Sequence, residues 1–148
     1  MTDAAALPYL DEHAILVAAS REATWAALLG MVQGIGSDRF VRMLGAVDAA
    51  SSGPRPLDVG STVPGFHVVV ADEPDELALA GRHRYADYLL TFRLEQAHDG
   101  GTRLAAVSRG AFPGWVGGLY RALVVGTRLH VLATRRMLVV VKRRAERR

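Results

Sequence analysis

The chain of 148 residues contains no cysteine. A disulfide framework and every metal site built on thiolates are therefore excluded. The absence suits a reducing compartment. Residues 1–12 carry three acidic side chains and no basic one, so no secretory signal is visible. We therefore expect a cytoplasmic protein.

A long uncharged apolar run is also missing. A membrane-spanning helix needs about 18 or more such residues, and the most apolar stretch, residues 115–141, is interrupted at helical intervals by arginines. No transmembrane segment is expected. With 50% hydrophobic and 22% charged residues, the composition is that of a folded globular chain. Its length predicts one domain spanning residues 1–148.

The charge is unevenly distributed along the chain. Residues 135–148 hold seven basic and one acidic side chain, while the remainder holds eleven basic and fourteen acidic ones, a net −3 against an overall +3. A basic tail, residues 142–148, allows weak contact with an anionic membrane. The simpler interpretation, which we prefer, is a solvated helix end whose cations suit the helix dipole.

The first half of the sequence predicts a strand followed by two helices. A β-branched apolar run covers residues 13–19, and Ser20 is a good N-cap for a helix over residues 23–32. A second helix is expected over residues 38–50, and residues 51–56 form a Pro- and Gly-containing loop.

From Gly60 onward the hydrophobic period changes to two. Strands are predicted over residues 65–71, 77–85, 88–95 and 102–112, and the short turns between them require antiparallel neighbours. One face is apolar, as expected for a sheet that is wet on one side. The other face carries a row of arginines: Arg82, Arg84, Arg93, Arg103 and Arg109. No exposed aromatics interleave with them for base stacking, so no nucleic-acid partner is expected.

A final helix is predicted from Trp115 to about Arg144. Basic residues recurring every seven positions, Arg121, Arg128, Arg135 and Lys142, define its solvent-facing stripe. The expected buried stripe lies opposite: Val116, Leu119, Leu123, Gly126, His130, Ala133, Met137 and Val141.

Two segments resemble signatures of one superfamily. They read Val17-x-Ala19-Ser20-x-Glu22-x-x-Trp25-x-x-Leu28, and Tyr88-x-Leu90-Thr91-Phe92-x-Leu94-Glu95 followed by Gly100-Gly101-Thr102-Arg103-Leu104. Together with the order of elements, they make the chain similar to the START-like, or SRPBCC, superfamily. The resemblance implies an α+β helix-grip fold, in which a curved antiparallel sheet wraps around a long C-terminal helix and two shorter helices follow the first strand. Many members place two more strands where this chain has residues 34–60, so the strand content of residues 34–64 stays open.

The resemblance also implies a cavity between sheet and C-terminal helix that takes a small apolar molecule. Members include binding proteins, cyclases and dehydratases, and catalytic residues are not shared among them. We expect binding of a small hydrophobic or amphipathic ligand, with no cofactor and no metal, by a monomer or homodimer. The predicted ligand-binding residues are Leu79, Gly81, His83, Tyr85, Leu90, Phe92, Ala106, Ser108, Leu119, Leu123, Gly126 and His130.

Four of these residues are polar and face inward by parity: His83, Tyr85, Ser108 and His130. Since an unmade buried hydrogen bond costs about 1–3 kcal/mol, each should have a partner. The first interpretation is that they bond to one another and close the pocket floor; the second is that they orient a ligand. The third is an enzyme of the cyclase or dehydratase type, in which His83 and His130 act as general acid and base on a polyketide-like or carbonyl substrate and Tyr85 as a donor.

Overall fold

A computed structural model describes residues 7–34, 52–54, 56–83, 86–112, 114–124 and 129–147. Within them, six strands form one antiparallel sheet in the order β1-β6-β5-β4-β3-β2. The elements in chain order are β1 (Tyr9–Val17), α1 (Arg21–Gln33), β2 (Thr62–Val63), β3 (Phe66–Asp72), β4 (Glu76–His83), β5 (Ala86–Gln96), the 3-10 turn η2 (His98–Gly100), β6 (Thr102–Ala111), α3 (Gly114–Val124) and α4 (Leu129–Glu146). The helix predicted over residues 38–50 lies outside the described residues.

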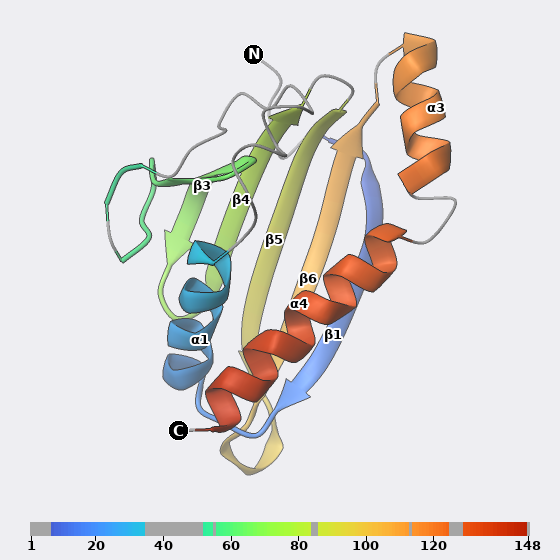
Figure 1. The fold of residues 1–148 in the computed structure, drawn as a ribbon. Coiled ribbons are helices and arrows are strands. Elements are labelled where there is room, and N and C mark those ends of the chain that lie inside the picture. The colour runs from blue at the N-terminus through green and yellow to red at the C-terminus, as the bar shows by residue number, and fades with distance from the viewer. Residues whose placement is uncertain are drawn as a thin grey trace.

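The sheet is a curved meander with β1 added at one edge. Strands β3 to β6 pair with their sequence neighbours, as their short turns required, and β1 pairs antiparallel with β6 although the whole meander separates them in sequence. Helices α1 and α4 lie on the same, concave face of the sheet (Figure 1). The α+β helix-grip architecture predicted from the sequence is therefore confirmed.

Helix α1 begins where the sequence places its cap. Ser20 is extended, and its hydroxyl accepts a hydrogen bond from the backbone N–H of Ala23 at 3.1 Å. This satisfies one of the donors that a helix N-terminus leaves unpaired. The helix ends at Gly34, whose N–H donates to the carbonyl of Met31.

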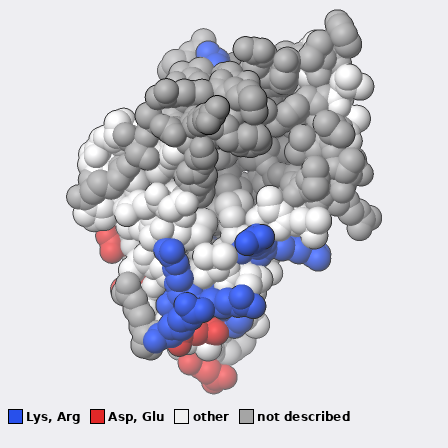
Figure 2. Space-filling model, viewed as in Figure 1, with Lys and Arg blue, Asp and Glu red and all other residues white. Residues whose placement is uncertain are grey.

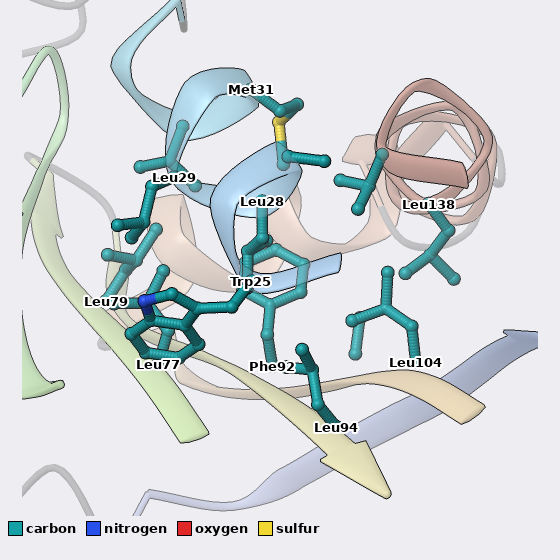
Figure 3. Close-up of a cluster of buried hydrophobic side chains, with 14 of the residues drawn as sticks. Trp25, Leu28, Leu29, Met31, Leu77, Leu79, Phe92, Leu94, Leu104 and Leu138 are labelled. Atoms are coloured by element: carbon teal, nitrogen blue, oxygen red, sulfur yellow. The ribbon is translucent and has the colours of Figure 1, made fainter. Parts of the chain in front are cut away.

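The main core lies between these two helices and the sheet. Figure 3 shows Trp25, Leu28 and Met31 of α1 and Leu138 of α4 converging above Phe92 and Leu104 of the sheet. Leu28, Phe92 and Leu104 are completely buried. Burying a side chain of this size stabilises the fold by about 1.5–3 kcal/mol. Hydrophobic packing in this cluster therefore holds the two helices against the sheet.

The C-terminal segment differs from the single helix predicted from residue 115. The structure has two helices, α3 and α4, and residues 125–128 between them lie outside the described residues. The predicted buried stripe is also partly wrong, because Leu119 is 65% exposed and Ala133 is exposed. Among the side chains of α4 that the structure describes, the buried ones are Thr134, Leu138, Val141 and Ala145.

The reason for this error is that α4 has apolar side chains on more than one face. Leu132 is 62% exposed and Val139 and Val140 are half-buried, so hydrophobicity alone does not distinguish the buried stripe. The 3.6-residue period is obeyed, but the buried face is rotated by about one residue from the predicted one.

The C-terminal end of α4 is fastened to the free edge of β1. Glu146 Oε1 accepts a hydrogen bond from the backbone N–H of Ala18 at 2.8 Å and pairs with Lys142. Lys142 Nζ also donates to the carbonyl of Leu16 at 3.0 Å. The hydrogen bond from Lys142, and then that from Ala18, hold the pKa of the Glu146 carboxyl below its usual value of 4.5.

We expect Glu146→Gln to lower Tm at pH 7, because it removes the charge that Lys142 faces. A carboxyl whose pKa is lowered by folding stabilises the protein above its unfolded pKa of 4.5, and this stabilisation is lost as the pH falls through the lower folded value. The Tm values of parent and variant should therefore converge well below pH 4.5. Glu95→Gln, an exposed residue of β5, is the control. An equal Tm difference at both pH values would contradict the role given to the charge.

Candidate functional site

Two polar side chains of β1 point toward the concave face. Strand alternation places Asp11 and His13 on the same side as Ile15 and Val17, and Val17 belongs to the main core. His13 Nε2 lies 3.2 Å from Asp11 Oδ2, and the two side chains are 19% and 24% exposed. The carboxylate therefore orients the imidazole at the edge of the concave face.

Ser108 adds a third polar group to this part of the sheet. It lies directly opposite Asp11 in the β1–β6 register and is completely buried. Its Oγ has no hydrogen-bond partner in the described structure. A buried hydroxyl of this kind costs about 1–3 kcal/mol and commonly marks a place where a water or a ligand binds.

A groove opens beside these residues, between β1 and α4. Its volume is about 320 Å³, at the lower end of the range of roughly 300–1,000 Å³ that small-molecule sites occupy. Ile15 and Leu138 give it an apolar wall, and Arg135 gives it one cation. The lining residues are His13, Ala14, Ile15, Arg135, Leu138 and Val139.

The apolar residues predicted to bind a ligand form the concave face, but their side chains are covered. Leu79, Phe92 and Ala106 are 0% exposed and Leu90 is 3% exposed. All four belong to the main hydrophobic cluster. Their predicted contact with a ligand stays a prediction, because in this structure they serve the core.

Gly81 does not leave open space for a ligand. A Cβ atom added there would lie 2.6 Å from the carbonyl oxygen of Gly65 and 3.1 Å from the Phe66 ring. The glycine instead permits close approach of the chain that precedes β3.

The remaining predicted positions are divided between the surface and parts that the structure does not describe. Leu119 is exposed on α3. The backbones of His83 in β4, Leu123 in α3 and His130 in α4 are described, but their side chains are not. Tyr85 and Gly126 lie outside the described residues. The proposed pairing of His83 and His130 therefore stays a prediction.

Sequence reasoning did not identify Asp11, His13 and Arg135 as site residues. The signal for the first two was present: a period-two pattern from residue 11 to residue 17 places both beside Ile15 and Val17. Arg135 was assigned to the solvent stripe of the last helix. Rotating the buried face of α4 as observed brings Arg135 to the rim of the groove.

Neither a membrane-spanning helix nor a metal cluster is found in the described part of the chain. None of its helices combines the length and apolarity needed to cross a bilayer. No group of three or more histidine, aspartate or glutamate side chains there is arranged to hold a metal ion.

Comparison with known proteins identifies the architecture. No model of a protein family matches the chain, and no curated protein matches it. Among solved structures, Mll3558 of Rhizobium loti is 17% identical with a TM-score of 0.57, covering 90% of this chain and 94% of that one. Ara h 8.0201 is 9% identical with a TM-score of 0.58, covering 93% and 97%.

A third similar structure is the di-domain ARO/CYC protein StfQ from the steffimycin biosynthetic pathway. It is 13% identical with a TM-score of 0.58, covering 93% of this chain and 50% of that one. Identities this low establish the fold alone. The shared fold is the α+β helix-grip architecture that the sequence predicted.

The unpartnered hydroxyl gives a test of this part of the sheet. We expect Ser108→Ala to leave the free energy of unfolding unchanged or to raise it by up to about 1 kcal/mol, because it removes a buried polar atom without breaking a hydrogen bond. Urea denaturation measures the change.

Thr102→Val is the matched control. Thr102 is equally buried, but its Oγ1 donates to the carbonyl of Ala19 at 2.8 Å. It should lose about 1–2 kcal/mol because that carbonyl is left unpaired. A comparable loss in Ser108→Ala would show that its hydroxyl has a partner.

Proposed function

We propose that the protein binds a small hydrophobic or amphipathic molecule in the groove between β1 and α4. The observation that carries the proposal is a groove of about 320 Å³ that is bordered by the half-buried apolar side chains of Ile15 and Val139. Apolar surface of this kind gains about 25 cal/mol per Å² when a ligand removes it from water.

The polar groups nearby support the proposal. His13, which is paired with Asp11, and Arg135 both line the groove. Small-molecule sites typically combine mostly apolar walls with a few placed polar groups. The START-like fold agrees with this, since the resemblance implies ligands held between sheet and C-terminal helix. We further propose a single cytoplasmic domain, acting as a monomer or homodimer.

The cyclase or dehydratase alternative depends on His83 and His130. It requires that the ring nitrogens of both side chains reach one open space. Unchanged turnover of a polyketide-like substrate by a His130→Ala variant would exclude it. No contact of the described residues favours this chemistry over simple binding.

The binding proposal is tested by filling the groove. Val139→Trp places an indole against its apolar wall, so we expect at least a tenfold weaker binding of the neutral fluorescent probe Nile red. Val59→Trp makes the same substitution at a residue that is 59% exposed and does not line the groove, and it should bind the probe as the parent does. Fluorescence titration gives both Kd values. Equal binding by Val139→Trp and the parent would place the ligand elsewhere.

We also propose that the outer face of α4 rests on an anionic lipid surface. Figure 2 shows Lys and Arg side chains gathered along α4 toward its C-terminal end. Arg136, Arg143 and Arg147 are exposed and have no ion-pair partner among the described residues. The exposed Leu132 shares their face at helical spacing. Basic residues mixed with apolar ones are typical of helices that lie on anionic membranes.

Vesicle cosedimentation tests this contact. Near an anionic membrane each arginine contributes about 1 kcal/mol, so the double variant Arg143→Gln/Arg147→Gln should bind phosphatidylserine-containing vesicles at least tenfold more weakly at low salt. Arg93→Gln, exposed on the sheet, is the control. The affinity of the parent should fall steeply with added salt. Salt-insensitive binding, or none, would contradict the proposal.

A further inference from the structure

Arg135 brings to the groove a charge that no described residue neutralises. It is exposed, lines the groove, and forms no hydrogen bond or ion pair with the described residues. Lys142, one helical repeat further on, is in contrast engaged by Glu146 and by the carbonyl of Leu16. Among the described residues that line the groove, Arg135 is therefore the available cation.

The free edge of β1 supplies a second donor. Gly110 N–H donates to the carbonyl of Pro8, so the even-numbered residues of β6 turn their backbone groups toward β1. These residues pair in the register with Asp11, His13 and Ile15, whose backbone N–H and C=O groups therefore point toward β6. The residues between them, Glu12, Ala14 and Leu16, must therefore turn their backbone groups away from the sheet.

Two contacts of α4 agree with this assignment. The carbonyl of Leu16 is reached by Lys142, and the N–H of Ala18, next in the same alternation, is reached by Glu146. Ala14 has no such contact in the described structure, although it lines the groove. Its N–H is an unpaired backbone donor on the same side of the strand as Arg135.

We infer that the groove selects amphiphiles that carry a single carboxylate. The carboxylate accepts hydrogen bonds from the guanidinium of Arg135 and the backbone N–H of Ala14, while the hydrocarbon part lies against Ile15, Leu138 and Val139. A guanidinium and a backbone N–H are both suited to a carboxylate, and hydrogen bonds to a charged group are the stronger ones. This inference rests on the function proposed above and adds the chemical class of its ligand.

The acidic residue near the groove does not cancel this preference. Asp11 is hydrogen-bonded to His13 and is not among the residues that line the groove. A neutral amphiphile of the same length would gain the apolar contacts but not the two charge-assisted bonds.

Isothermal titration with decanoic acid and decan-1-ol separates the contribution of the carboxylate from that of the apolar contacts. The parent should bind the acid about tenfold more tightly than the alcohol, since hydrogen bonds to a charged group are the stronger ones and exposure of the site to water weakens them. Arg135→Gln should bring the Kd of the acid most of the way to that of the alcohol, since only the bond from the Ala14 N–H remains. Arg135→Lys should keep part of the preference, and Arg136→Gln, on the outer face, should keep all of it.

The outcomes distinguish the inference from the function beneath it. Equal affinity of the parent for acid and alcohol, or an unchanged preference in Arg135→Gln, overturns the inference while Nile red binding leaves the proposed function standing. Binding of neither ligand, together with no Nile red binding, overturns both. Tm values of the variants equal to that of the parent establish that the fold is intact.

Discussion

The packing of α4 across the concave face of the sheet determines the rest of this structure. Leu138, Val141 and Ala145 bury one face of the helix against the sheet and α1. Because a helix that crosses a curved sheet cannot contact all of it equally, the same packing leaves a groove where α4 passes the edge strand β1. The bonds of Lys142 and Glu146 to the β1 edge fix the helix at its other end.

This arrangement leaves α4 with apolar side chains on both of its sides. One side is buried and apolar. The other is one continuous face, on which Arg135 and Val139 border the groove and Leu132, Arg136 and Arg143 are exposed. A helix with a simple two-sided pattern would have one polar and one apolar face. The additional apolar residues of α4 explain both why it is suited to interactions beyond the core and why its buried stripe was assigned incorrectly from the sequence.

The parts predicted well are those in which local chemistry and periodicity agree. Ser20 caps α1 as its sequence indicated, and the meander from β3 to β6 followed from period-two patterns and short turns. The pairing of β1 with β6 was not predicted, since no local signal joins strands so distant in sequence. The division between α3 and α4 was missed because helical periodicity continues through residues 115–144.

The candidate site was harder to predict because its residues have ordinary neighbours in sequence. Asp11 and His13 lie in a strand in which only alternation assigns them to the concave face. Ser108 is distinguished by the absence of a hydrogen-bond partner for its hydroxyl, which only the described structure reveals. Predicted residues such as Leu79 and Phe92 face the correct way, yet direction alone does not say whether a side chain meets a ligand or the core. That distinction depends on tertiary packing, which no local pattern encodes.

The groove and the basic outer surface are adjacent faces of the same helix, and this adjacency links the two proposals. Arg135 lines the groove, while its sequence neighbour Arg136 belongs to the outer face. A membrane that binds the outer face would therefore lie next to the mouth of the groove. An acidic amphiphile leaving an anionic membrane would meet first the outer arginines and then Arg135, with the Ala14 N–H behind it, so the charges that attract the surface also lie along the path of the ligand.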